Sequence, residues 1–242
     1  MSTPPSNPLK SVLITGANRG LGAAIAEVFH DAGWHVIGTA RKSGDLDEAY
    51  IDTTCTLDLA DPHSLRSATD TLIKDGHQID LLINNAGFNP KDRKDDPSYF
   101  RSTFTIDSFS AANVAQSIWI NALAPTEFVS KLLPVLAPDA VVLNVSSWLG
   151  SIGGKSNGGH YGYAGSKALL NMMTRALACE WTDDPRSAVA LNPGWMSTDM
   201  GGAKANRSPA QTAADIFWLY ANGTLTAANG RFLNTDGSDH PW

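Results

Sequence analysis

The chain has little cysteine and no long uninterrupted hydrophobic run. Cys55 and Cys179 are its only two cysteines, and their wide separation argues against a disulfide framework. No stretch approaches the ~18 consecutive apolar residues of a membrane-spanning helix. Residues 1–8 are rich in serine and proline rather than apolar residues, so they predict a flexible N-terminal lead and not a signal peptide. Together these absences favour a cytoplasmic protein that does not bind membranes.

Positive charge is also scarce. Lys and Arg total 18 against 24 Asp and Glu, and the net charge of −6 argues against nucleic acid as the main partner. The six histidines show no metal-ligand spacing, so no metal site is expected. The hydrophobic content of 43%, with 17% charged residues, is typical of a globular chain with a sizeable core.

Short aliphatic runs alternate with longer helical patterns along the chain. Strands are predicted near 12–14, 35–37, 55–57, 80–83, 140–145, 188–191 and 231–233, and helices near 20–32, 62–75, 108–133, 163–181 and 208–221. Two of these helices open with an N-cap followed by proline, at Asp61-Pro62 and Ser208-Pro209. The alternation predicts an α/β fold, a Rossmann-type doubly wound parallel sheet of about seven strands with helices on both faces. Because no repeat or linker interrupts it, residues 1–242 are expected to form a single domain.

One stretch, from 88 to about 107, is long, polar and charged. It contains the run Lys91-Asp92-Arg93-Lys94-Asp95-Asp96. This stretch is expected to be a solvated loop. Because it follows the fourth strand, its ends should lie near the carboxyl edge of the sheet, where doubly wound folds bind ligands.

A glycine-rich turn joins the first strand to the first helix. Its sequence is Thr15-Gly16-Ala17-Asn18-Arg19-Gly20-Leu21-Gly22. Glycine lets the backbone turn tightly and approach a pyrophosphate, and the helix N-terminus beyond it offers free amides and a positive dipole. After a strand and before a helix, this motif indicates dinucleotide binding.

The residues after the second strand bear on which dinucleotide binds. Arg41 and Lys42 follow it, and no carboxylate occurs before Asp45. Arg41 and Arg19 would flank a 2′-phosphate through bidentate hydrogen bonds, so NADP(H) is favoured. NAD(H) is possible if Asp45 or Asp47 reaches the ribose instead.

Tyr163 and Lys167 stand four residues apart in a predicted helix, so their side chains share one face. An ammonium about 4 Å from a phenol would supply about 4 kcal/mol at an effective dielectric near 20, enough to lower the phenol pKa from ~10 to ~7. A phenol tuned in this way can donate and accept protons. Taken alone, such a pair more often lies on a solvated helix face.

These motifs, in this order, resemble those of the short-chain dehydrogenase/reductase family. The turn over 15–22 matches its TGxxxGxG motif, Asn84-Asn85-Ala86-Gly87 its NNAG, Tyr163 and Lys167 its YxxxK, and Pro193 to Thr198 its PGxxxT. Asn121 and Ser147 are similar to the family's helix asparagine and its serine. Finer details, at 198–202 and 237–242, resemble the carbonyl-reductase branch that includes sniffer and C-factor proteins.

The resemblance implies roles for four catalytic residues and a set of cofactor-binding residues. Tyr163 would donate a proton to a carbonyl oxygen, Lys167 would lower the Tyr163 pKa and bind the nicotinamide ribose, Ser147 would hold the carbonyl oxygen, and Asn121 would hold a water that relays protons. The single domain would therefore be an NAD(P)-binding Rossmann domain. The cofactor-binding residues would be Gly16, Asn18, Arg19, Gly20, Leu21, Gly22, Arg41, Asp58, Leu59, Asn85, Ala86, Gly87, Tyr163, Lys167, Pro193, Gly194, Met196 and Thr198.

Several of these roles have open alternatives. The spacing from Ser147 to Tyr163 is longer than in the commonest members, so either Ser146 or Ser147 could face the substrate; Ser147 is preferred for its place before x-x-Gly. Asp58 would also suit an Asx turn. The substrate-pocket candidates are Phe88, Trp148, His160 and Trp195, although His160 also suits the surface and Trp195 the core.

The resemblance implies an NADPH-dependent reductase of a small-molecule ketone, aldehyde or quinone. The alternatives are an NAD(P)+-dependent alcohol dehydrogenase and a regulator that senses NADP(H) without turnover. A homodimer or homotetramer, paired through the helices near 108–133 and 163–181, is also expected from the resemblance. The identity of the substrate does not follow from these motifs.

Overall fold

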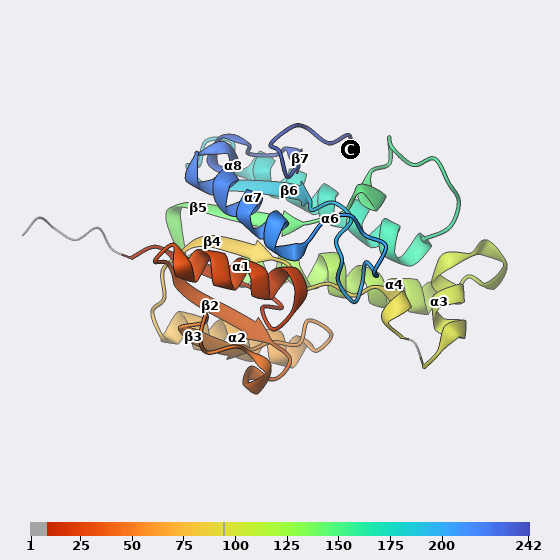
Figure 1. Ribbon diagram of the computed structural model, residues 1–242, viewed down its shortest axis with the longest axis horizontal. Coiled ribbons are helices and arrows are strands. Elements are labelled where there is room, and N and C mark those ends of the chain that lie inside the picture. The colour runs from red at the N-terminus through yellow and green to blue at the C-terminus, as the bar shows by residue number, and fades with distance from the viewer. Residues whose placement is uncertain (1–8, 94) are drawn as a thin grey trace, which may run out of the picture.

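The sheet consists of seven parallel strands in the order β3-β2-β1-β4-β5-β6-β7 (Figure 1). The computed structural model describes residues 9–93 and 95–242, so the predicted lead over 1–8 lies outside the described residues. The strands are β1 Ser11–Ile14, β2 His35–Ala40, β3 Thr53–Thr56, β4 Ile79–Asn84, β5 Leu136–Val145, β6 Ser187–Asn192 and β7 Phe232–Asn234. The predicted doubly wound parallel sheet is confirmed.

Helices cover both faces of this sheet. They are α1 Gly20–Asp31, α2 Pro62–Lys74, α3 Pro97–Phe104, α4 Ala111–Ile118, α5 Ala124–Leu132, α6 Tyr161–Glu180, α7 Pro209–Ala221 and α8 Thr224–Ala227. One core cluster joins the sheet to α1, α7 and α8, and the other joins it to α2, α5 and α6. Figure 1 shows α1 and α7 side by side on the first of these faces.

Successive side chains along each strand point to opposite faces of the sheet and so contribute to the two hydrophobic cores in turn. In β1, Val12 and Ile14 face the α1–α7 side, whereas Leu13 between them faces the α2–α6 side. The same division holds in β4, where Ile83 belongs to one core and Leu82 to the other. A strand buried on both faces needs apolar residues at every position, which is why these runs are continuously hydrophobic.

The winding of the chain reverses between β1 and β4. From β1 the chain proceeds through β2 to β3 at one edge, then returns to β4 on the other side of β1 and continues to β7. The loops that leave the carboxyl ends of β1 and β4 therefore part in opposite directions, and a crevice opens between them. Both the glycine turn and the Asn84–Gly87 segment lie at this point.

The structure corrects the expectation of a solvated loop from 88 to 107, because this stretch contains α3. Asp96 caps the helix by accepting from the Tyr99 amide at 3.1 Å, and Pro97 occupies its first position. This is the same N-cap and proline signal that predicts the helices at Asp61-Pro62 and Ser208-Pro209. The signal is present at Asp96-Pro97 but follows directly on a dense charge run, which is typical of a loop.

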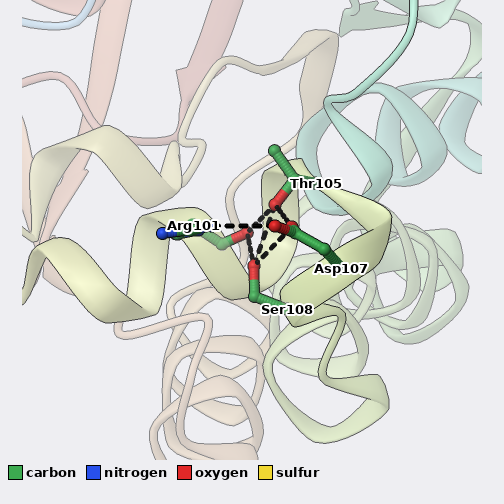
Figure 2. A network of polar contacts seen from close by, with 4 residues as sticks. All are labelled: Arg101, Thr105, Asp107 and Ser108. Atoms are coloured by element: carbon green, nitrogen blue, oxygen red, sulfur yellow. Dashed lines mark hydrogen bonds and ion pairs between the residues drawn. The ribbon is translucent and has the colours of Figure 1, made fainter.

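A compact polar network closes the turn between α3 and α4 (Figure 2). The Arg101 guanidinium donates to the Asp107 carboxylate at 2.7 Å, and the Thr105 hydroxyl donates to the same carboxylate. The Ser108 hydroxyl donates to the Arg101 carbonyl oxygen at 3.1 Å. The bonds to the carboxylate, the one from Thr105 first, lower the pKa of Asp107 to about 2. The turn therefore keeps its charge pairing across the neutral and mildly acidic range.

The helix predicted over 108–133 is interrupted. Between α4 and α5 lies one π-helical segment, Trp119–Leu123, which contains Asn121. Within it the Trp119 indole donates to the Leu59 carbonyl oxygen at 2.9 Å, on the far side of the crevice. Such π segments often occur at functional sites because they re-aim side chains.

The structure also bears on membrane insertion and metal binding. Within 9–93 and 95–242, no helix is both long and apolar enough to cross a membrane. The same residues contain no group of three or more His, Cys, Asp or Glu side chains placed to hold a metal ion.

Candidate active site

The turn after β1 needs glycine for two different reasons. Gly16 and Gly20 have φ angles of 67° and 57°, in the left-handed region that side chains rarely adopt. A Cβ on Gly16 would also stand 3.1 Å from the Ala86 Cα, in the loop after β4. Gly22 is buried in α1, where a Cβ would collide with the Gly16 carbonyl oxygen. The glycines therefore allow the turn to pass close to its neighbours.

Hydrogen bonds hold this turn against the loop after β4. The Thr15 hydroxyl accepts from the Asn85 and Ala86 amides, each at 3.0 Å. The Asn85 side-chain amide donates to the carbonyl oxygens of Thr15 and Gly16 at 3.0 and 3.1 Å. The glycine turn and the NNAG segment, about 70 residues apart in sequence, thus form one rigid edge of the crevice.

The N-terminus of α1 has the chemistry of an anion site. Asp61, Asp96, Ser110 and Ser208 cap α2, α3, α4 and α7 with side-chain oxygens. At α1, in contrast, Arg19 occupies the cap position and no side chain caps the helix. The first amides and the positive end of the helix dipole are therefore available to a phosphate group. The site fits a dinucleotide pyrophosphate.

A cleft of about 710 Å³ runs from this turn to α6. Most of the predicted cofactor-binding residues border it: Gly16, Asn18, Arg19, Gly20, Leu21, Arg41, Asp58, Leu59, Asn85, Ala86, Gly87, Tyr163, Lys167, Pro193, Met196 and Thr198. Gly22 and Gly194 do not border it. Gly194 instead forms a left-handed turn, with φ 78°, in the segment after β6.

Opposite charges meet at the end of the cleft near β2. Arg41 and Asp45 are both exposed and both border the cleft, so the two predicted means of reading the ribose lie side by side. Arg19 forms an ion pair with Asp199, at 2.6 Å, from the segment after β6. Asp58 makes the Asx turn, accepting from the Ala60 amide at 2.9 Å, and still borders the cleft.

Tyr163 and Lys167 lie one turn apart on α6 and both border the cleft. The Lys167 ammonium is buried and donates to the Val145 carbonyl oxygen at 2.7 Å, and it lies 6.0 Å from the centre of the Tyr163 ring. Burial lowers the pKa of Lys167 to about 8. The lysine therefore stays close to the phenol while changing protonation state near neutral pH.

The structure corrects the expected tuning of Tyr163. Burial raises the pKa of this phenol to about 12; the Ser147 side chain lowers the value in part, and the charge of Asp92 raises it further. The expectation of a pKa near 7 assumed an ammonium about 4 Å from the phenol. The Lys167 ammonium donates one hydrogen bond to the Val145 carbonyl oxygen, and the loss of solvent around the phenol is the largest influence on the pKa of Tyr163.

The two adjacent serines have different surroundings. The Ser146 hydroxyl is buried and donates to the Asn171 side-chain oxygen at 2.6 Å, although Ser146 also borders the cleft. The Ser147 hydroxyl accepts from the Leu149 amide at 3.2 Å and interacts with Tyr163. Ser147 is therefore the serine whose hydroxyl is beside the tyrosine.

Asn121 organises the loop that floors the cleft. Its side chain accepts from the Phe88 amide at 2.7 Å and donates to the Phe88 carbonyl oxygen at 2.8 Å and to the Ser166 hydroxyl at 2.9 Å. Gly87 lies between Asn121 and Lys167, since a Cβ there would be 3.5 Å from the Asn121 oxygen and 3.8 Å from the Lys167 nitrogen. A Cβ at position 87 would therefore make ordinary van der Waals contact with both groups. The water relay through Asn121 remains a prediction.

The four substrate-pocket candidates separate. Phe88 borders the cleft, whereas Trp148, His160 and Trp195 do not. Trp148 and Trp195 are 48% and 50% exposed, and the His160 ring packs edge-on against Phe104, 4.4 Å between ring centres. His160 adopts a left-handed conformation, with φ 64°, directly before α6.

Other residues border the cleft without having been predicted. They include Asp92, Arg93, Gln116, Ile120, Asp199 and Met200. The Met200 sulfur lies 4.0 Å from the Tyr163 hydroxyl oxygen. Asp92 and Arg93 belong to the charged run, and the position of that run after β4 was the one signal that pointed to a ligand site.

Comparison with known proteins gives a consistent family. The family model described as short chain dehydrogenase matches residues 10–208. The C-signal protein of Myxococcus xanthus is 33% identical over 166 residues, which cover 68% of this chain and 93% of that protein.

Solved structures agree over nearly the full length. A short-chain dehydrogenase/reductase from Burkholderia multivorans with bound NADP is 31% identical, with a TM-score of 0.82, and covers 97% of this chain and 100% of its own. The carbonyl reductase Sniffer of D. melanogaster is 27% identical, with a TM-score of 0.81 and the same two coverages. These relatives confirm the branch that the sequence resembles.

The serine geometry makes a prediction for stability. Ser146→Ala leaves the buried Asn171 oxygen without its donor and should lower the free energy of unfolding by about 1–3 kcal/mol. Ser147→Ala is the matched control and should cost less, because the Leu149 amide is partly exposed and can bind water. Urea unfolding followed by tryptophan fluorescence measures the free energy of unfolding of both variants. An equal loss in the two variants, or a larger loss in Ser147→Ala, would contradict the hydrogen-bond assignment of Ser146.

Proposed function

The chain belongs to the short-chain dehydrogenase family, and we propose that it is an NADPH-dependent carbonyl reductase that converts a ketone, aldehyde or quinone to an alcohol. It is an oxidoreductase of this family. One observation carries the proposal: a single cleft is bordered both by the uncapped N-terminal turn of α1 and by Tyr163 and Lys167. A hydride donor and a proton donor would therefore meet in one site.

The residues along the cleft suit the successive parts of NADPH. The amides of the glycine turn would bind the pyrophosphate, Asp58 and Leu59 the adenine, and Lys167 the nicotinamide ribose. Arg41 would hold the 2′-phosphate, because its guanidinium borders the cleft and has no ion pair among the described residues. The Burkholderia multivorans structure with NADP supports this choice of cofactor. Bound NADPH supplies the hydride.

The protonation of Tyr163 supports the reductive direction. With a pKa of about 12, the phenol holds its proton at neutral pH and can donate it to a carbonyl oxygen. Oxidation of an alcohol would require the phenolate, which burial disfavours. The Lys167 ammonium would stabilise the phenolate as the proton leaves, and the Ser147 hydroxyl would bind the carbonyl oxygen.

The proposed partner is a small-molecule carbonyl compound, and the chain would act as one nucleotide-binding domain. Pairing into a homodimer or homotetramer and a cytoplasmic location remain predictions. A regulator that binds NADP(H) without turnover is the remaining alternative. Nothing in the site favours it, since Asn121, Ser147, Tyr163 and Lys167 are all present.

Tyr163→Phe tests the proton donor. Without the hydroxyl, NADPH oxidation should fall by about 10²–10⁴-fold across a panel of ketones, aldehydes and quinones, because no other acid is expected to reach the carbonyl oxygen. NADPH binding, measured by fluorescence titration, should persist. Substantial residual turnover in the variant would show that another acid serves. NADPH binding by the wild-type protein without turnover of any panel member would favour the sensor.

Arg41→Asp tests the reading of the 2′-phosphate. Loss of the guanidinium and gain of a carboxylate should raise the KM for NADPH about 10- to 100-fold and invert the preference toward NADH. Arg66→Asp, on the exposed surface of α2, makes the same charge change away from the cleft and is the control. An unchanged NADPH preference in Arg41→Asp would reject the assignment.

The pKa of Lys167 predicts the pH dependence of reduction. Below about 8 the ammonium is present and stabilises the phenolate that forms as Tyr163 gives up its proton. As the pH rises through about 8 the lysine becomes neutral, this stabilisation is lost, and kcat/KM should fall while Tyr163 is still protonated. Lys167→Met should be slow at every pH and show no such fall. The same decline in a folded Lys167→Met variant would place the titration elsewhere.

A further inference from the structure

Arg93 occupies the cleft in a way that the cofactor does not explain. It is half-buried, and its guanidinium carbon lies 4.2 Å from the centre of the Tyr99 ring and 5.9 Å from that of Phe88. Its Nη2 donates to the Gln116 side-chain oxygen at 3.2 Å. Arg93 belongs to none of the family motifs. It is also distant in sequence from Arg41, the residue proposed to bind the 2′-phosphate of the cofactor.

The support beneath Arg93 is rigid. Tyr99, on α3, is only 5% exposed, and its hydroxyl donates to the Gln116 side-chain oxygen at 2.5 Å and contacts the Asn113 carbonyl oxygen at 3.3 Å. Because Gln116 lies on α4, residues from two helices, α3 and α4, hold the Arg93 guanidinium. A guanidinium stacked on an aromatic face and bonded at one edge has lost most of its freedom before any ligand arrives.

Arg93 forms no ion pair within residues 9–93 and 95–242, although its charge is one of the smaller causes that lower the pKa of Asp96. Arg101, Arg186, Arg207 and Arg231, in contrast, each form an ion pair with an aspartate. Its bond to Gln116 accounts for one of five N–H donors, and the others have no acceptor within residues 9–93 and 95–242. A partly desolvated guanidinium in a cleft favours an anion from the ligand.

The position of Arg93 suits the substrate end of the cleft. Phe88, Tyr163 and Met200 border the same cleft, and Met200 contacts the Tyr163 hydroxyl. Asp92, the neighbour of Arg93, lies close enough to act electrostatically on Tyr163. Asp92 and Arg93 both border the cleft, so the Arg93 guanidinium faces the same space as Tyr163.

We propose that Arg93 binds a carboxylate of the substrate, so that the preferred substrates are carbonyl compounds that also carry a carboxylate. The planar fork of the guanidinium matches a carboxylate through two parallel hydrogen bonds. Binding there would orient the substrate with its carbonyl group toward Tyr163. This inference rests on the proposed reductase function and adds a substrate class to it.

The test uses a matched pair of ligands on the purified full chain. 4-(Hydroxymethyl)benzoate and its methyl ester, both alcohol products, differ only in the charged group, and calorimetry measures their binding to the NADP+-saturated protein. The corresponding aldehydes, 4-carboxybenzaldehyde and its methyl ester, measure turnover. The variants are Arg93→Met and, as control, Lys91→Met, which removes an exposed cation of the same segment that does not border the cleft.

The wild-type protein and Lys91→Met should bind the carboxylate at least about tenfold more tightly than the ester. Arg93→Met should reduce this preference below about threefold and leave NADPH affinity within about twofold. Equal binding of the two ligands by the wild type, or a preference that survives in Arg93→Met, would overturn the proposal. So would weakened NADPH binding as the main effect of the variant, which would make Arg93 a cofactor residue.

The binding and turnover measurements separate this proposal from the proposed function. Preferential binding of the carboxylate, lost in Arg93→Met, supports the Arg93 site even if neither aldehyde is reduced, an outcome that would count against the reductase. Reduction of both aldehydes with equal efficiency and equal product binding would support the reductase and reject the carboxylate site.

Discussion

The hydrogen bonds between Thr15 and the loop after β4 are the constraint on which the rest of the site depends. They lie at the point where the sheet reverses direction, and a polar seam continues from them. Asn84 donates to Asn144 at 2.8 Å, and Asn144 donates to Thr174 on α6 at 2.8 Å. The glycine turn is thus tied through β4 and β5 to the helix that carries Tyr163 and Lys167. Buried polar groups are costly when they lack a hydrogen-bond partner. These bonds therefore favour one register of the paired strands over its neighbours.

Burial then sets the protonation of the reacting groups. The same loss of solvent raises the pKa of Tyr163 and lowers that of Lys167, because each shift favours the neutral form. The phenol therefore keeps its proton at neutral pH, and Lys167 loses its charge as the pH rises through about 8. The carbonyl oxygen of Val145 holds the ammonium and limits how closely it approaches the phenol. Burial therefore shifts the pKa of both groups more than their mutual electrostatic interaction does.

Much of this was predictable from local patterns. Runs of apolar residues buried on both faces identify parallel strands, and the NNAG, YxxxK and glycine motifs identify the residues around the cleft. Helix α3 could also have been predicted, since Asp96-Pro97 repeats the N-cap and proline pair that predicts the helix at Asp61-Pro62. The π-helical segment at Asn121 was not, because a single extra residue in a helical turn leaves no clear change in periodicity. Trp148 and Trp195 do not border the cleft, since adjacency to a motif does not decide which way a side chain points.

By itself, the sequence determined the order of the seven strands, most of the helices, the glycine turn and the identity of the polar groups on α6. These depend on residues close together in the chain, whose conformational preferences act locally. Only the tertiary structure decided that Ser146 bonds to Asn171 while Ser147 is beside Tyr163, and that Arg19 pairs with Asp199. It also decided that Arg93 stacks on Tyr99 and forms no ion pair within the described part of the chain. Each of these depends on the packing of distant segments and on how much water that packing removes. The strength of an ion pair or a hydrogen bond depends on the distance between its groups and on their burial. Neither quantity can be read from a local sequence pattern.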